Sequence, residues 1–266
     1  FKALNIYLHP MLPKLTLITI SYRACKQLEA TIRSVAAQDC AELEYIVVDG
    51  GSDDGTVELL ERYNYVVHAY VSEADQGIYD ALNKGLKMAR GPLLGFLHAG
   101  DRFAHEQVLS RVLSSYEKAP WDLLYGDLQY VTSFEPLRVL RLWKSGVFKA
   151  KGLRHGWMPP HPSVYFTRDL LEQIGNFDTS FRIAADYDWL LRALTVQGLR
   201  VKYLPEVLVN MQAGGVSNGS LRGLLQKSRE DFRALRKNRV GGWYSLLAKN
   251  LRKSGQFFQR RKAPRA

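Results

Sequence analysis

The stretch YIVVDGGSDDGTVELL, residues 45–60, joins a run typical of a buried strand to the start of a helix. Its first four residues are large and apolar, as in a strand covered on both faces of a sheet. The chain places three carboxylates and three glycines between the strand and the helix. Ligands of open parallel sheets bind beyond the carboxyl ends of the strands, so this loop predicts a ligand site.

The same strand and helix pattern repeats over residues 15–125. Strand-sized apolar runs alternate with amphipathic runs of helical period, which predicts a sheet with helices on both faces. The expected strands are 15–20, 45–48, 66–71, 93–97 and 123–125, and the expected helices are 28–38, 56–63, 78–89 and 106–116. The sequence therefore predicts an α/β fold with a mostly parallel central sheet.

The regular alternation stops near residue 126. Residues 126–165 are rich in proline, tryptophan and basic side chains, and we expect them to be irregular. A long irregular segment inside a compact protein is more often functional than structural. A helix near 187–196 and a short strand at 200–204 are expected to follow.

Positive charge is concentrated at the end of the chain. The formal net charge of the 266 residues is +11, but residues 222–266 carry 14 Lys and Arg against 2 Asp and Glu, a net of +12, which leaves −1 for the remainder. A nucleic-acid partner is not favoured, because the body is neutral. The hydrophobic content of 46% excludes a chain that is disordered over most of its length.

The cysteine content and the apolar runs bear on the compartment. No apolar run approaches the roughly 18 residues of a membrane-spanning helix, and the N-terminal stretch lacks a secretory-signal pattern. Cys25 and Cys40 are too few for a disulfide framework, which favours a reducing compartment. We therefore expect a cytoplasmic protein.

Two strand ends carry candidate ligand-binding carboxylates. Asp49 follows the strand at 45–48 and could accept hydrogen bonds from a base or a ribose, while Gly50 would let a ligand approach the backbone. No Lys-Ser/Thr pair follows, so the loop is not a phosphate loop, and capping of the next helix by Ser52 or Asp54 is the alternative. Asp101, in GFLHAGDRF, could supply a hard oxygen ligand to a cation, or else cap a turn.

Five segments occur in order from about residue 14 to 217. They are LTLITISYRACKQLEATIRSVAAQ, YIVVDGGSDDGT, SEADQGIYDALNKGLKMARGPLLGFLHAGD, HPSVYF and GNFDTSFRIAADYDWLLR. Together they resemble family 2 glycosyltransferases of the GT-A nucleotide-diphospho-sugar transferase fold, and they are similar above all to bacterial polysaccharide enzymes with the motif S-E-x-D-x-G-I-Y-D-A-x-N-K-G.

The resemblance implies transfer of a sugar from a nucleotide-diphosphate donor to an acceptor hydroxyl, with Mg²⁺ or Mn²⁺ on the diphosphate. Ser21 and Tyr22 match positions beside the nucleotide, and Asp49 matches the first aspartate of a D-D-G-S motif. Asp101 matches the last aspartate of a D-x-D region and is the expected metal ligand. Asp186 matches the catalytic base.

Further donor-binding candidates lie on a helix and in loops. Tyr79 and Asn83 are four residues apart and could reach the donor, with Asp75 in the turn before them. His161, held between prolines, matches a histidine beside donor or acceptor. Packing and capping are the alternatives for these residues. The residues expected to close over the diphosphate, with a simple turn as the alternative, are Gly214, Gly215 and Ser217.

The chain departs from the family pattern at three places. The second aspartate of D-D-G-S is Gly50, the D-x-D region keeps only one carboxylate, and Ala185 replaces a glutamate before Asp186. Asp186 and Asp188 are two apart on a helix and do not share a face. We expect Asp188 to form a surface ion pair with Arg192, which leaves Asp186 for the site, a helix cap being the alternative.

The resemblance also divides the chain. Residues 1–219 are expected to form the transferase domain, with a nucleotide-binding half at 14–125 and an acceptor half at 126–219. Residues 220–266 are expected to form a basic amphipathic helical tail at the cytoplasmic face of the inner membrane, where a saccharide on a polyprenyl diphosphate would be the acceptor. The alternative for the tail is a helix packed on its own domain.

The predicted function is an inverting glycosyltransferase of polysaccharide, O-antigen or exopolysaccharide assembly. The alternative is a catalytically degenerate module that binds a nucleotide sugar or a polymer, which measurable donor turnover would exclude. A sugar-phosphate nucleotidyltransferase is a further alternative, but the early segment SYRACKQLEA lacks the glycine-rich basic signature that a triphosphate favours.

Overall fold

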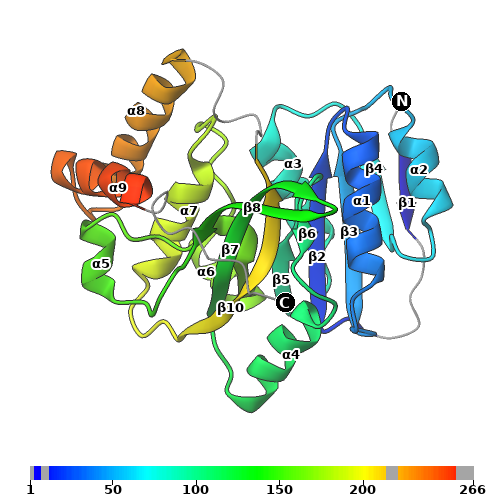
Figure 1. Cartoon of the computed structure of the whole chain (residues 1–266), viewed down its shortest axis with the longest axis horizontal. Helices are drawn as coiled ribbons and strands as arrows, with labels where there is room; N and C mark the ends of the chain where they lie inside the picture. Colours follow the sequence, from blue (N-terminus) through cyan, green and yellow to red (C-terminus); the bar gives the residue numbers. More distant parts are fainter. Residues whose placement is uncertain (1–2, 7–11, 214–220, 256–266) are drawn as a thin grey trace.

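The computed structural model describes residues 3–6, 12–213 and 221–255. The strands within this part are β1 (Ala3–Ile6), β2 (Leu15–Ser21), β3 (Leu43–Asp49), β4 (Ala69–Ser72), β5 (Leu93–Phe96), β6 (Arg102–Phe103), β7 (Leu123–Phe134), β8 (Leu137–Trp143), β9 (Val164–Thr167) and β10 (Val201–Gln212). They form one sheet in the order β1-β4-β3-β2-β5-β9-β7-β10-β6, with β8 paired to β7 (Figure 1).

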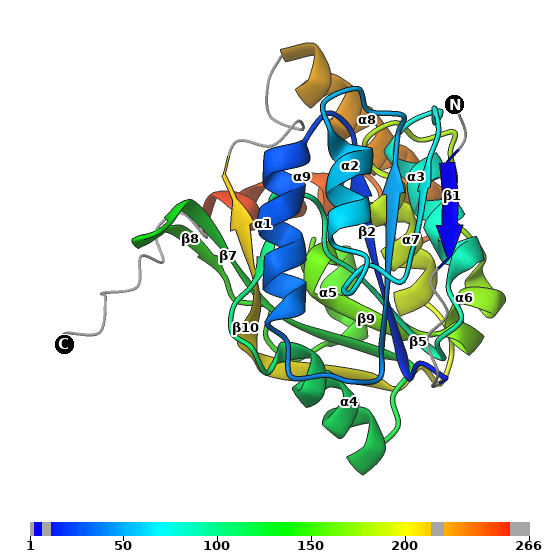
Figure 2. The same ribbon diagram turned by 90° about the vertical axis from the view of Figure 1, so that its right-hand side faces the viewer.

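Helices cover both faces of this sheet. They are α1 (Cys25–Ala36), α2 (Thr56–Arg62), α3 (Ile78–Met88), α4 (Val108–Lys118), α5 (Ala150–Arg154), the 3-10 turn η1 (His161–Ser163), α6 (Arg168–Ile174), α7 (Ala185–Leu194), α8 (Leu221–Lys237) and α9 (Trp243–Gly255). One buried core contains side chains of α1, α2 and α4, and the other contains side chains of α3, α6 and α7. Figure 2 shows α1 and α2 in front of the sheet.

The first half of the sheet follows the sequence prediction. Strands β4, β3, β2 and β5 are parallel neighbours. Along β3, Ile46 and Val48 point into one core while Tyr45 and Val47 point into the other, as expected for a strand buried on both faces. The register pairs Ser21 with Asp49 and Asp49 with Ser72, so polar side chains gather at one edge. The α/β class is confirmed.

The expectation that residues 126–165 are irregular was wrong. Strand β7 continues to Phe134 and forms an antiparallel hairpin with β8, and β9 lies between β5 and β7 and runs antiparallel to both. The second half of the sheet is therefore mixed. The side chains of Leu137 to Leu140 in β8 are all exposed, so this strand lacks the apolar alternation that identifies a half-buried strand.

Strand β10 is also longer than expected. The prediction ended the strand at 204, but β10 continues to Gln212. Its register against β7 shifts between Tyr203 and Val207 and again between Val207 and Val209. These irregularities accommodate Pro205, which cannot donate a ladder hydrogen bond.

The helical tail packs on the rest of the protein. Ala234 and Leu235 of α8 are fully buried, and Leu246 of α9 is 6% exposed, in the same core as α7. Lys249 of α9 forms an ion pair with Asp231 of α8 at 2.7 Å. The alternative considered for the tail, a helix packed on its own domain, describes these contacts. The domain boundary expected at residue 219 stays a prediction.

Candidate active site

Asp49 organises the loop that follows β3. Its side chain is fully buried, and Oδ2 accepts hydrogen bonds from the backbone of Gly51 and Ser52 and from the hydroxyl of Ser72, at 3.1, 2.8 and 2.6 Å. Oδ1 accepts one from the Ser52 hydroxyl at 2.5 Å. These bonds fix the loop at the carboxyl edge of the sheet, and a direct contact of Asp49 with the donor stays a prediction.

Gly50 has no side chain at the position where the family pattern has an aspartate. A Cβ at this position would lie 2.7 Å from Oδ2 of Asp75 and 3.1 Å from Cδ2 of Tyr22. The other oxygen of Asp75 accepts the N–H of Gly77 at 2.8 Å, and Tyr22 is 59% exposed. The structure therefore places the Asp75 carboxylate and the Tyr22 ring, two predicted site residues, on either side of residue 50.

The loop carboxylates after Gly51 do not cap α2. The N-cap of this helix is Gly55, with a φ of 87° and no side-chain cap. Asp53 instead forms an ion pair with Arg23 at 2.9 Å, and Asp54 accepts the N–H of Cys25 at 2.9 Å. The acidic loop thus holds the β2–α1 loop.

Ser21, at the end of β2, has a buried hydroxyl with no hydrogen-bond partner among the described residues.

Asp186 lies in the first turn of α7 with one oxygen held. Oδ1 accepts the N–H of Tyr187 at 2.8 Å and lies 3.3 Å from the hydroxyl of Tyr79, which also donates to the carbonyl of Ile183 at 2.7 Å. Burial and the nearby charge of Asp186 raise the pKa of Tyr79, so this hydroxyl stays a donor. Within the described chain, Oδ2 of Asp186 accepts no hydrogen bond, which leaves it able to take a proton.

Asp188 points away from Asp186, as predicted, but its ion pair is not at the surface. Its side chain is fully buried. It pairs with Arg192 at 3.0 Å and Lys237 at 3.1 Å, and accepts from the amide of Asn238 at 2.9 Å. The expectation of a surface pair was wrong because α8, far along the chain, covers this face of α7.

Aromatic rings adjoin the Tyr79 and Asp186 pair. His161 stacks on Phe96 with ring centroids 5.2 Å apart and on His98 at 6.1 Å, and it meets the edge of Phe177 at 5.7 Å. Burial lowers the pKa of His98 to about 3 and that of His161 also falls, so both rings are neutral. His98 Nδ1 and His161 Nε2 are buried with no hydrogen-bond partner among the described residues. Buried polar atoms normally have a partner, so these two nitrogens are candidates to bind a ligand.

Asn83 lies next to this group but uses its amide on the backbone. Its Nδ2 donates to the carbonyl of Phe177, and its Oδ1 accepts the N–H of the same residue, each at 3.0 Å. These bonds hold Phe177 against Tyr79, whose ring lies 5.9 Å from it. A contact of Asn83 with the donor stays a prediction.

Asp101 stands at the edge of the sheet as a nearly enclosed carboxylate. Asp101 is 5% exposed, and burial raises its pKa to about 7. The hydrogen bond from the N–H of Gln212 acts in the other direction and lowers the pKa. Among the described residues no three His, Cys, Asp or Glu side chains gather as a cation site. A Mg²⁺ or Mn²⁺ ion would therefore have Asp101 as its protein carboxylate and would need oxygens from the diphosphate and water.

The hydroxyl of Tyr130 of β7 is affected by the charges of both Asp101 and Asp186. Burial raises its pKa, Arg141 opposes the shift, and the charges of Asp101 and Asp186 both add to it. Arg141 of β8, only 5% exposed, stacks over this ring with its guanidinium carbon 4.3 Å from the centroid. The sequence analysis missed both residues, because they lie on the hairpin that was expected to be irregular.

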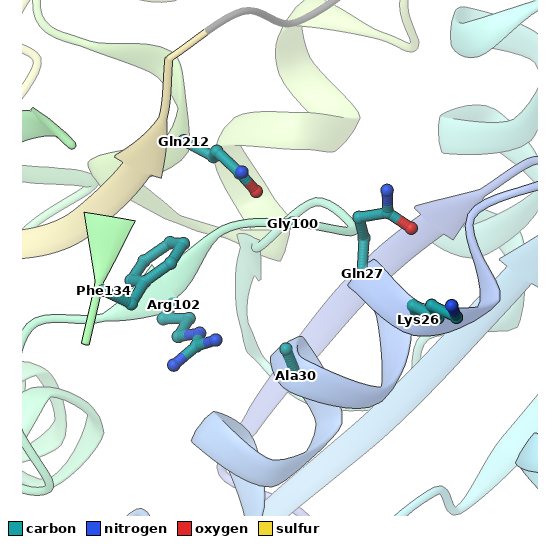
Figure 3. Close-up of a pocket in the computed structure, with 7 residues that line it drawn as sticks. All are labelled: Lys26, Gln27, Ala30, Gly100, Arg102, Phe134 and Gln212. Atoms are coloured by element: carbon teal, nitrogen blue, oxygen red, sulfur yellow. The ribbon is translucent and has the colours of Figure 1, made fainter. Parts of the chain in front are cut away.

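A cavity of about 250 Å³ opens beside Asp101. In Figure 3 Gly100 lies between Gln27 of α1 and Gln212 at the end of β10. The lining residues are Lys26, Gln27, Ala30, Gly100, Arg102, Phe134 and Gln212. The three residues expected to close over the diphosphate, Gly214, Gly215 and Ser217, lie outside the described residues.

The chain is similar to known glycosyltransferases. The family model described as glycosyl transferase family 2 matches residues 16–180. A PGL/p-HBAD biosynthesis glycosyltransferase of Mycobacterium bovis is 30% identical over 215 residues, covering 77% of this chain and 80% of the relative. An uncharacterised glycosyltransferase of Mycobacterium tuberculosis is 34% identical over 192 residues, covering 69% and 70%.

Solved structures show the same fold. TarS of S. aureus in complex with UDP-GlcNAc has a TM-score of 0.65 at 18% identity, over 85% of this chain and 66% of that chain. In the TarS 1–349 structure, with a TM-score of 0.64 at 19% identity, this chain spans 64% of the other chain's length. A mannosyltransferase of Pyrobaculum calidifontis with GDP-Man and Mn²⁺ has a TM-score of 0.64 at 19% identity, over 90% and 70%. With the family match, the GT-A fold is confirmed, and the chain belongs to glycosyl transferase family 2 and is a glycosyltransferase.

Proposed function

We propose that this enzyme moves a sugar from a nucleoside-diphosphate sugar to an acceptor hydroxyl with inversion at the anomeric carbon. The observation that carries the proposal is the geometry of Asp186, with Oδ1 fixed by Tyr79 and Tyr187 and Oδ2 open. A positioned general base of this kind contributes roughly 10² to 10⁴ in rate.

The reaction is a single displacement. Oδ2 of Asp186 takes the proton of the acceptor hydroxyl, and the acceptor oxygen forms a bond to the anomeric carbon. The bond from that carbon to the diphosphate oxygen breaks with its electron pair, and the nucleoside diphosphate leaves from the opposite face of the sugar. The chain contributes orientation, because Tyr79 and the backbone of Tyr187 hold the base in one position.

The donor would lie along the edge formed by Ser21, Tyr22 and Asp75. The buried free hydroxyl of Ser21 and the exposed ring of Tyr22 suit a ribose and a stacked base. His161 Nε2, which has no hydrogen-bond partner among the described residues, is proposed to face the sugar. Nucleotide sugars are the ligands in the TarS and Pyrobaculum structures, which supports this donor class. A Mg²⁺ or Mn²⁺ ion at Asp101 would stabilise charge on the departing diphosphate.

The acceptor proposed is a cell-envelope glycoconjugate or a growing polysaccharide on a lipid carrier. The mycobacterial relative is named for PGL biosynthesis, and its name supports an envelope product. The described residues contain no helix long and apolar enough to cross a bilayer. A lipid-linked acceptor would therefore be met from the surface of the membrane.

Helix α9 offers a surface for such a membrane contact. It turns one face, with Ser245 and Leu246, toward the body, and its opposite face carries four large apolar side chains that are 59–72% exposed. This stripe consists of Trp243, Tyr244, Leu247 and Leu251. A helix that only packed on the body would turn such side chains inward, whereas an interfacial helix turns them toward lipid.

Part of the positive charge of the tail is used inside the protein, and part of it is exposed. Lys237 and Lys249 pair with buried carboxylates, while Arg236, Arg239 and Arg252 are exposed. Each exposed Lys or Arg near an anionic leaflet contributes about 1 kcal/mol. We propose peripheral binding at the cytoplasmic face of the inner membrane.

The test is release of nucleoside diphosphate from a panel of UDP-, GDP- and dTDP-sugars, with and without Mn²⁺ and in the presence of lipid extract as a source of acceptor. Asp169→Asn, an exposed carboxylate at the start of α6, is the matched control for Asp186→Asn. Release from one donor that the control keeps and Asp186→Asn loses supports the proposal. Binding of donors without any turnover would favour a nucleotide-sugar-binding module.

A further inference from the structure

Glu230 of α8 contacts the segment that leads into α7. Its Oε2 accepts the backbone N–H groups of Arg182, Ile183 and Ala184 at 3.1, 2.8 and 3.0 Å. Its Oε1 lies 3.2 Å from the N–H of Arg182 as well. The two segments are 46 to 48 positions apart in the chain, and α8 lies beside α7 in the fold (Figure 1).

Three consecutive N–H groups directed at one carboxylate form an anion-binding nest. Ala184, the residue before α7, has no side-chain cap from its own neighbourhood, so Glu230 supplies the acceptor from a distance. Burial opposes ionisation of Glu230, but the N–H groups and the amide of Gln226, 3.0 Å away, favour it and lower its pKa. The nest therefore holds a carboxylate that is charged at neutral pH.

The same segment is held from its other side by the residue that contacts the base. Ile183 gives its N–H to Glu230 and accepts the Tyr79 hydroxyl at its carbonyl, 2.7 Å away. Tyr79 also reaches Oδ1 of Asp186, three residues further on. The backbone ahead of Asp186 is thus fixed between α3 and α8.

We propose that Glu230 is a positioning residue for the transfer reaction, holding residues 182–184 so that the Asp186 carboxylate meets the acceptor hydroxyl. The proposal rests on the proposed role of Asp186 as the base. A misplacement of about 1 Å at a reacting group costs about 10²-fold in rate. Loss of the nest should therefore lower kcat and leave the affinity for the donor unchanged, because the donor edge lies on other elements.

The experiment compares Glu230→Ala and Glu230→Gln with Arg229→Ala, an exposed side chain of the same helix, and with Asp186→Asn. The probes are UDP-GlcNAc and GDP-Man with Mn²⁺, and each variant is assayed at a temperature where its circular dichroism shows it folded. Glu230→Ala is expected to lower kcat at least about tenfold with donor KM within about twofold. Glu230→Gln should recover part of kcat, since its amide oxygen still accepts N–H groups, and Arg229→Ala should match the wild type.

The outcomes separate the two proposals. If Asp186→Asn abolishes release while folded Glu230→Ala keeps wild-type kcat, the positioning role is wrong and the proposed base stands. If Glu230→Ala raises donor KM at unchanged kcat, the positioning role is equally overturned. If Asp186→Asn releases nucleoside diphosphate as fast as the wild type, the proposed function itself fails. Should Glu230→Ala not fold, Glu230→Ser, whose short side chain also removes the carboxylate from the nest, decides, with wild-type kcat counting against the proposal.

Discussion

The hydroxyl of Tyr79 on α3 lies 3.3 Å from Oδ1 of Asp186 on α7, although 107 positions separate the two residues along the chain. The contact joins the helix that follows β4 to the start of the helix in the second half of the protein. A base that must meet an acceptor hydroxyl in one orientation needs such a fixed side chain.

Tyr79→Phe should lower kcat while keeping the fold. The substitution removes the hydroxyl contacts with Asp186 and Ile183 and leaves the ring stacked on Phe177. A hydrogen bond to a charged group is worth about 1.5–3 kcal/mol, which corresponds to a fall in kcat of roughly 10- to 100-fold. Steady-state kinetics at saturating donor measure it, and an unchanged kcat would show that Asp186 does not depend on this contact.

The loss of donor affinity caused by Gly50→Asp should be reversed by a second substitution, Asp75→Gly. Gly50→Asp places a side chain within 2.7 Å of the Asp75 carboxylate, where both the clash and the like charges are unfavourable. We expect the single variant to weaken donor binding at least about tenfold, and Asp75→Gly in the same protein to recover most of it. Isothermal titration calorimetry with the donor tests this, and a double variant as weak as Gly50→Asp alone would contradict the shared position.

The stripe on α9 should be required for membrane binding. Trp243→Ser with Leu247→Ser removes two exposed apolar side chains and leaves the buried Leu246 in place, although it also removes the stacking of Trp243 on Phe232. Burying each would contribute about 1.5–3 kcal/mol, so flotation with anionic vesicles should fall more than tenfold.

Leu137→Ser with Leu140→Ser on the β8 hairpin is the matched control for the stripe, since these side chains are 50% and 42% exposed. This control should bind vesicles as the wild type does. Equal loss in both double variants would mean that general surface hydrophobicity, rather than α9, sets the binding.

The contribution of Glu230 to stability should depend on pH in one direction. Its pKa is lowered in the folded protein, with burial opposing the shift and the N–H groups of the nest causing it. The carboxylate therefore stabilises the fold fully above its unfolded pKa of about 4.3, and this contribution is lost as pH falls through the lower folded pKa. Denaturant unfolding of wild type and Glu230→Gln should differ at pH 7 and converge below pH 4, and a constant difference would contradict the shift.

The parallel strands of the first half of the sheet could be predicted because local residue types determine them. Buried runs such as LTLITI and YIVV fit only the interior of the sheet, and polar residues directly after them mark its carboxyl edge. Asp49, Asp101 and Asp186 could therefore be named as candidate site residues from spacing and family resemblance, and their roles stay predictions. The single carboxylate in the D-x-D region and the glycine at residue 50 were also visible in the sequence.

Contacts between distant segments could not be predicted in this way. The hairpin of β7 and β8 carries exposed apolar and basic side chains, so its alternation is lost in the sequence. Asp188 was expected at the surface because nothing local indicates that α8 covers it. Glu230 resembles any helix-surface glutamate until the fold brings residues 182–184 beside it. Each of these depends on tertiary packing rather than on local pattern.

The measurement that tests the central claim most directly is donor turnover and donor affinity in Asp186→Asn. Asparagine keeps the size of the side chain and cannot take a proton at neutral pH. The account predicts that release of nucleoside diphosphate falls at least about 10²-fold, while the donor Kd measured by calorimetry stays within about threefold of the wild-type value. Wild-type turnover in the folded variant would show that Asp186 is not the base and would contradict the mechanism.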